Sequence, residues 1–341
     1  MIWLSWRQFR LHALTAVVAV AVVAVVLATT GPRLADLAAA GAAQVFDRLT
    51  PTDTTLFWSG VILMAVVPAV VGAFWGAPLV ARELEAGTHR LAWTQSVTRT
   101  RWLVTKIAVT CAAAAVAVGA LTLGVSWWSA PLDGVVGSAR GSLPGHLTPV
   151  TFAMRGVVPV AYAVFAVVLG VALGAVLRRP IPAMALTLAL YLAVQVVVPL
   201  WVRPHLVPPT TATVVISRDT LDGISADQSG RPDAITVHTA DRGDWILSNE
   251  TLDRTGSVAA LPAWMTDCTG SAPATEVDGA VRAQPVDPCL ARLTAEGYTQ
   301  RVVYQPAGKY WTIQGAETAL YLAVSGLLAG FCVWWTRHRL S

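Results

Sequence analysis

The sequence predicts an all-α polytopic membrane protein, with six transmembrane helices and an extracytoplasmic β-rich or α+β domain between helices 5 and 6. Composition is the first observation behind this fold class. Of the 341 residues, 55% are hydrophobic and only 13% are charged, which is about half the charged share of an ordinary soluble domain. The other two observations are six long apolar runs and one polar stretch at residues 204–315.

The six apolar runs are long enough to cross a bilayer, because a hydrocarbon core about 30 Å thick needs roughly 20 helical residues. They contain few charges, and the stretch from residue 57 to residue 81 contains none. We therefore expect spans at residues 12–30, 57–80, 103–128, 154–177, 181–202 and 316–336.

The first run has two interpretations, a secretory signal peptide or a retained span. Its length and the aromatic residues Trp3, Trp6 and Phe9 that precede it favour a retained span. These aromatics, together with two arginines, predict that residues 1–11 form a short helix at the membrane surface.

The distribution of charge predicts the orientation. If the amino terminus is cytoplasmic, the inner segments are 1–11, 81–106, 178–180 and 337–341, and only two acidic residues fall in them. Cytoplasmic loops carry an excess of Lys and Arg, so both termini are predicted to be cytoplasmic in a bacterial plasma membrane. The eleven basic residues of the inner segments are Arg7, Arg10, Arg82, Arg90, Arg99, Arg101, Lys106, Arg178, Arg179, Arg337 and Arg339.

The predicted organisation follows from the runs and their orientation. It consists of a cytoplasmic interfacial helix (1–11), helices 1–5 (12–203) with a cytoplasmic loop (81–102), the extracytoplasmic domain (204–315), helix 6 (316–336) and a cytoplasmic tail (337–341).

The polar stretch 204–315 contains 13 of the 20 acidic residues and short β-prone runs separated by turn residues, which predicts a small folded domain. Cys268 and Cys289 both fall in it, on the oxidising side of the membrane, and therefore predict a disulfide. The alternative is two free thiols. Cys111 and Cys332 lie in apolar runs and are expected to be core residues.

Motifs for catalysis are missing from the sequence. It contains no phosphate-binding loop, no His-Glu-x-x-His, no Cys-x-x-Cys and no Gly-x-Ser-x-Gly. We therefore expect no enzyme activity, no catalytic residues and no metal site. The pI near 9.1 is explained by the membrane-flanking arginines rather than by a nucleic-acid partner. Because the middle of each run is uncharged, ion-driven transport is disfavoured, and any transport would take its energy from another subunit.

Three of the apolar runs contain a Gly-x-x-x-Gly pattern, which lets helices approach closely. Packing inside the bundle is the favoured interpretation, and a dedicated dimer face is the alternative. The pairs are Gly72/Gly76, Gly170/Gly174 and Gly326/Gly330.

The first predicted cytoplasmic loop carries a more specific pattern. Glu83-x-Glu85-x-Gly87-Thr88, followed by Ser96-x-x-Arg99 and Lys106, resembles the loop of ABC-2 type permeases, the membrane subunits of ATP-binding-cassette exporters. In this sequence Ser96 replaces a proline that is common there. The stretch from Tyr304 to the basic carboxyl-terminal tail is similar to an actinobacterial branch of that family.

The resemblance implies a division of labour between subunits. This chain would form the translocation pathway for an export substrate. A separate ABC ATPase subunit would bind ATP, so this chain needs no cofactor. The second permease of the dimer would be another copy or a paralogue. Residues 1–11 would form an elbow helix, and the ATPase-coupling loop would include Glu83, Glu85, Gly87, Thr88, Arg90 and Arg99.

Two other functions compete with this interpretation. One is a membrane-anchored extracytoplasmic binding or sensor protein without transport activity, in which the domain at 204–315 is the working part. The other is an integral membrane enzyme, for which the sequence shows no motif.

Overall fold

The computed structural model describes residues 2–40, 48–87, 98–133, 144–228, 231–241, 243–266, 276–277, 280–281 and 287–339. The chain divides into two compact units. The helical unit consists of Met1–Val135, Thr148–Val207 and Tyr310–Ser341. The β unit consists of Val136–Leu147 and Pro208–Lys309.

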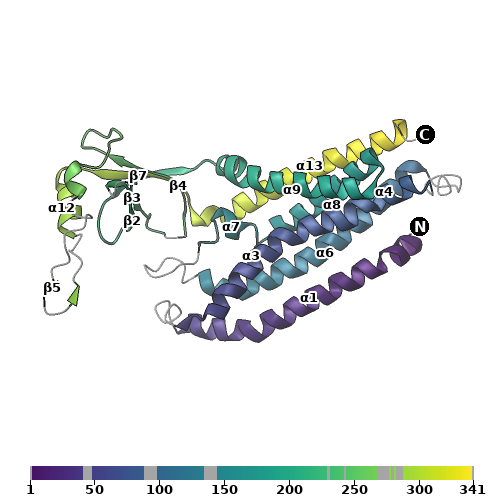
Figure 1. Cartoon of the computed structure of the whole chain (residues 1–341), viewed down its shortest axis with the longest axis horizontal. Helices are drawn as coiled ribbons and strands as arrows, with labels where there is room; N and C mark the ends of the chain where they lie inside the picture. The colour runs from purple at the N-terminus through teal and green to yellow at the C-terminus, as the bar shows by residue number, and fades with distance from the viewer. Residues whose placement is uncertain are drawn as a thin grey trace. The chain divides into compact units, whose positions relative to one another are not determined.

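The helical unit is a bundle of long helices that run alternately up and down, so that both termini lie at the same end (Figure 1). Its described elements, in chain order, are α1 (Ile2–Ala39), α3 (Pro51–Val71), the π-helical turn η1 (Gly72–Gly76), α4 (Ala77–Glu85), α6 (Arg99–Asp133), α7 (Pro149–Phe152), α8 (Val158–Leu177), α9 (Pro180–Val197), the π-helical turn η2 (Val198–Val202), α10 (Arg203–Leu206) and α13 (Tyr310–His338).

Within the described residues, six helical stretches are long and apolar enough to cross a membrane, which confirms the predicted number of spans. Five of them extend beyond the predicted runs because the helices continue through polar residues at their ends, whereas the fourth begins later than predicted, at Val158. Their bounds are Leu14–Ala39, Pro51–Glu85, Arg99–Asp133, Val158–Leu177, Pro180–Leu206 and Ala307–His338.

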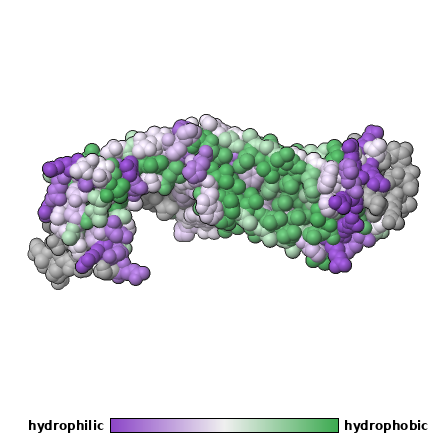
Figure 2. Space-filling view, turned by 90° about the horizontal axis from the view of Figure 1, so that it is seen from above, coloured by the Kyte–Doolittle hydropathy of each residue, from purple (hydrophilic) through white to green (hydrophobic). Residues whose placement is uncertain are grey.

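The lipid-facing surface of these helices is apolar. Large side chains such as Ile62, Leu192 and Leu327 are 62%, 56% and 76% exposed, which suits a hydrocarbon solvent rather than water. Figure 2 shows this surface as a continuous green band over the helices, with a purple cap at the end that carries the termini.

Helix α8 lies at the centre of the bundle, and glycines let its neighbours approach it closely. A Cβ atom on Gly72 would lie 2.6 Å from the Cβ of Ala166 in α8, and one on Gly170 would lie 2.7 Å from the backbone nitrogen of Ala77. The first two Gly-x-x-x-Gly patterns therefore pack against each other inside the bundle. Around Gly326 and Gly330, by contrast, the described residues place no atom within 4 Å of such a Cβ.

The described residues of the β unit form a three-stranded antiparallel sheet of order β1-β7-β4, a β2-β3 hairpin, a β5-β6 pair, the α-helix α12 and the short 3-10 helices η3 (Ala263–Met265) and η4 (Ala307–Lys309). This arrangement agrees with the predicted β-rich or α+β region between helices 5 and 6. The elements are β1 (Thr210–Val215), β2 (Leu221–Ala226), β3 (Pro232–Val237), β4 (Trp245–Leu252), β5 (Glu276–Val277), β6 (Ala280–Val281), α12 (Asp287–Ala295) and β7 (Thr299–Gln305).

The β unit has a hydrophobic core of its own. Val302 of β7 lies opposite Ala212 of β1 and Asn249 of β4. The Asn249 amide donates to the carbonyl of Val237 at 2.8 Å, so a side chain connects the sheet to the hairpin. The buried apolar core is formed by Ile216, Ile235, Val237, Met265, Leu290, Leu293 and Val302.

The predicted disulfide is only half inside the described part of the chain. Cys289 lies in α12 and packs against the core of the β unit, whereas Cys268 lies outside the described residues. The pairing therefore stays a prediction. Cys111 and Cys332 are free thiols within the helical unit, Cys332 fully buried, as expected for core residues.

Protein purified without reductant should contain a Cys268–Cys289 disulfide. Closing a loop of this length stabilises a fold by about 3 kcal/mol, and the predicted extracytoplasmic location would permit the bond to form. Mass spectrometry of non-reduced peptides measures the bond, and Cys111 and Cys332 serve as the control because both should be alkylated after denaturation. Recovery of Cys268 and Cys289 as alkylated thiols would remove the disulfide.

Candidate functional site

Helix α4 ends, and α6 begins, at the end of the helical unit that carries the termini (Figure 1). Helix α4 ends at Glu85, Gly87 follows with a φ of 70°, and Arg99 begins α6. A positive φ favours glycine because it has no Cβ, which explains why the helix stops there. Thr88 and Arg90 lie outside the described residues.

Glu83 and Glu85 have different surroundings, although both were predicted to contact an ATPase. Glu85 is exposed. Glu83 forms an ion pair with Lys106 of α6, whose side chain is only 10% exposed. The Lys106 ammonium also lies 4.7 Å from the centre of the Trp102 ring. Glu83 therefore connects α4 to α6, while Glu85 lies on the surface of the bundle.

Two further hydrogen bonds connect helices at this end. The Arg337 guanidinium of α13 donates to the Thr100 hydroxyl of α6 at 2.8 Å. The Arg178 guanidinium, in the turn between α8 and α9, donates to the carbonyl of Arg339 at 3.0 Å. We call this part of the bundle the basic end, after its exposed residues Arg82, Arg101, Arg178, Arg179, Arg337 and Arg339.

A second site lies inside the bundle, where Arg203 and Glu317 form an ion pair with both side chains 0% exposed. The Glu317 carboxylate accepts from Arg203 Nε at 2.6 Å and Nη2 at 3.0 Å, and from the Tyr162 hydroxyl at 2.5 Å. The guanidinium also lies 4.3 Å from the centre of the Phe152 ring. Buried charges of this kind are stable only when they are paired, and here each charge has several partners.

The ion pair continues into a chain of polar side chains. The Tyr321 ring contacts the Tyr162 ring edge to face, with centroids 4.7 Å apart. The Tyr321 hydroxyl donates to the Gln195 side-chain oxygen at 2.9 Å, and the Gln195 amide donates to the Tyr191 hydroxyl at 2.8 Å. These contacts join α8, α9, α10 and α13. We call this set the polar network, consisting of Tyr162, Tyr191, Gln195, Arg203, Glu317 and Tyr321.

Sequence reasoning missed the polar network because it placed Arg203 and Glu317 at the outer margins of their spans. Both residues instead lie within the longer helical stretches Pro180–Leu206 and Ala307–His338. The available signal was their opposite charge at the adjoining ends of two consecutive apolar runs, which suggests a pair because isolated charges are costly in a membrane.

The fourth span was predicted to begin at residue 154, but residues 154–157 connect α7 to α8 and are not part of the α8 helix. Helix α8 begins at Val158, and the backbone before it is irregular. The Gln314 side-chain oxygen accepts from the backbone nitrogens of Val157 at 3.1 Å and Val158 at 3.0 Å, and its amide donates to the carbonyl of Arg155 at 3.1 Å. Gln314 therefore satisfies the first backbone donors of α8, which have no partner within the helix.

Both sites join helices through ion pairs and hydrogen bonds. In the part of the chain that the structure describes, no group of three His, Cys, Asp or Glu side chains could hold a metal ion. The basic end offers a charged surface on connected helices, and the polar network fixes four helices through paired charges. Both sites are suited to transmitting or resisting helix movement.

The fold and these sites define a multi-pass membrane protein. The family model described as ABC-2 membrane transporter related matches residues 16–203, more than half of the chain. The chain therefore belongs to this family of membrane transporter permeases, which confirms the resemblance seen in the loop sequence. No curated protein and no solved structure matches the chain. The matched region contains the whole predicted coupling loop, whereas most of the β unit and α13 lie after it.

Proposed function

We propose that this chain is the permease subunit of an ABC exporter, and that a separate ATPase subunit binds its basic end in the cytoplasm. The observation that carries the proposal is the family match across residues 16–203, which includes the predicted coupling loop and nearly all of the first five spans. In this arrangement the chain forms the translocation pathway together with a second permease, either another copy or a paralogue.

The contacts at the basic end give this coupling a physical route. An ATPase that contacts Glu85 would move α4, and the Glu83–Lys106 ion pair would carry that movement to α6. The hydrogen bond between Arg337 and Thr100 would extend it to α13. Nucleotide binding in the partner would thereby shift several spans together.

Reversing the exposed charge with Glu85→Lys should reduce co-purification of the tagged permease with an ABC ATPase encoded beside its gene. An exposed charge contact contributes up to about 1 kcal/mol, so we expect roughly fivefold weaker association and a lower substrate-stimulated rate of ATP hydrolysis. Glu83 is left unchanged because reversing it would place two positive charges side by side at Lys106.

The matched control is Asp233→Lys, which reverses an exposed acidic residue of the β unit and should leave association unchanged. Equal ATPase recovery from the Glu85 and Asp233 variants, with equal rates of hydrolysis, would contradict the coupling role. Failure of any ATPase to co-purify with the unaltered chain would favour the sensor alternative.

A further inference from the structure

Helix α1 is held against α6 near one end of the bundle. The Trp128 indole nitrogen of α6 donates to the Thr30 hydroxyl at 2.8 Å. At Gly31, a Cβ atom would lie 2.6 Å from the Trp127 ring, so the backbone of α1 lies directly against that ring. Leu34, one turn further, is 1% exposed. These contacts fix the carboxyl-terminal third of α1.

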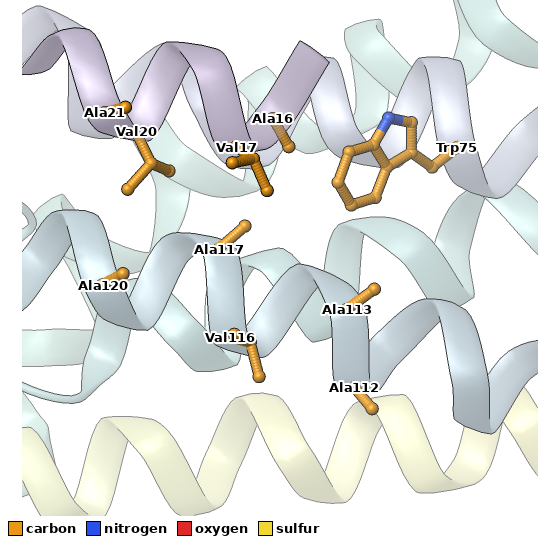
Figure 3. Close-up of a pocket in the computed structure, with 10 residues that line it drawn as sticks. All are labelled: Ala16, Val17, Val20, Ala21, Trp75, Ala112, Ala113, Val116, Ala117 and Ala120. Carbon is orange, nitrogen blue, oxygen red and sulfur yellow. The ribbon is translucent and has the colours of Figure 1, made fainter. Parts of the chain in front are cut away.

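Closer to the amino terminus, the two helices leave an apolar groove of about 550 Å³ between them. In Figure 3, Val17 and Val20 point from α1 toward α6, and the Trp75 ring of η1 lies beside them. The groove lies within the membrane-spanning stretches of all three segments. Its lining residues are Ala16, Val17, Val20, Ala21, Trp75, Ala112, Ala113, Val116, Ala117 and Ala120.

Two arginines of the basic end lie on the same helical stretches as residues that line the groove. Arg82 follows Trp75 by seven residues, close to two helical turns, and Arg101 precedes Ala112 by eleven residues, close to three turns and about 16 Å along the axis. Each arginine therefore lies on roughly the same helix face as a lining residue. Both are exposed, and within the described residues neither forms an ion pair.

We propose that this groove binds one acyl chain of a membrane lipid whose anionic headgroup is held by Arg82 and Arg101. The volume falls in the range of about 300–1,000 Å³ that small-molecule sites occupy, and the lining offers only apolar contacts. Basic residues near the membrane surface attract anionic headgroups. The charge at the end of the groove therefore selects the headgroup, while the groove holds the chain.

A flexible alkyl chain can follow the small side chains of α6 that line the groove. The two exposed arginines favour an anionic lipid over an apolar helix face of a second permease as the occupant. The inference does not depend on the ATPase, since it concerns the permease alone.

The test is native mass spectrometry of the purified permease in detergent, titrated separately with phosphatidylglycerol and phosphatidylcholine of identical acyl chains. Val116→Trp should fill the groove and reduce binding of both lipids severalfold. Because Val116 is 74% exposed, this change leaves the core untouched. The matched control is Leu327→Trp in α13, at a residue 76% exposed but outside the groove.

The headgroup contacts are tested with Arg82→Gln and Arg101→Gln, each of which should weaken phosphatidylglycerol binding about fivefold and leave phosphatidylcholine unchanged. Arg179→Gln, at another exposed arginine of the basic end, should have no effect. Equal losses from Val116→Trp and Leu327→Trp, or no preference for phosphatidylglycerol, would show adventitious lipid only and overturn the proposal. Loss of permease dimers from Val116→Trp with lipid binding retained would assign the groove to a second copy and overturn it as well.

Discussion

Replacing Gly170 with valine is expected to destabilise the helical unit by about 3 kcal/mol or more. A Cβ atom at Gly170 would lie 2.7 Å from the backbone nitrogen of Ala77, and a backbone atom cannot move aside as a flexible side chain can. The substitution would force α8 away from α4 along their shared contact, and overpacking of this kind costs 1–3 kcal/mol or more. Thermal unfolding of the purified protein in detergent measures the loss.

The matched control is the same substitution at Gly326, in the Gly-x-x-x-Gly pattern of α13. Among the described residues nothing lies within 4 Å of a Cβ placed there, so Gly326→Val should change the free energy of unfolding by less than about 0.5 kcal/mol. Similar losses at both glycines would show that the contact between α8 and α4 does not determine stability.

Breaking the buried ion pair should have an effect of similar size. Arg203→Met leaves the Glu317 carboxylate without its cation in a fully buried position, and removing one partner of such a pair costs about 3–5 kcal/mol. Glu317→Gln should also destabilise, because the guanidinium then loses its counter-charge. The double variant should be more stable than the sum of the single losses predicts, since it removes both charges together.

The control pair for this cycle is Arg218 and Asp287 in the β unit, whose side chains are 74% and 49% exposed. Exposed pairs contribute at most about 1 kcal/mol, so Arg218→Met should have little effect. Thermal unfolding of all variants gives the coupling energies. A strictly additive double variant of Arg203 and Glu317 would contradict a direct pairing of the two charges.

The number of spans was predictable from the sequence because length and hydrophobicity alone decide whether a helix can cross a bilayer. The polar stretch between the fifth and sixth spans was also predictable, because its acidic residues interrupt the apolar pattern. At Gly72, the Gly-x-x-x-Gly pattern predicted that another helix would approach closely. It did not predict that this helix would be α8.

Side-chain partners far apart in sequence were not predictable. Arg203 and Glu317 are separated by 114 residues, and Gln314 caps a helix 156 residues away. A single sequence gives no signal for such pairings. Arg203 directly follows the fifth predicted run and Glu317 lies at the start of the sixth, so the sequence placed both residues at the ends of spans and not in a network inside the bundle.

The predicted coupling loop shows the same limit on a smaller scale. Its charged residues flank a helix end, and α4 stops just before Gly87, whose φ is positive. The exposed Glu85 and the paired Glu83 are nevertheless two residues apart on one short helix, and the sequence gives them the same chemistry. Only the position of Lys106, on the next span, separates the surface residue from the one that connects α4 to α6.

The Arg203–Glu317 pair also bears on how such a chain can evolve. Arg203 precedes the segment Pro208–Lys309 of the β unit and Glu317 follows it, so their contact joins the two ends of the chain that flank this segment. The entropy of closing the intervening segment grows only slowly with its length. Insertions, deletions or replacement of the whole segment would thus leave the closure of the bundle almost unaffected, which makes this junction a point where new domains can be acquired at little risk to the spans.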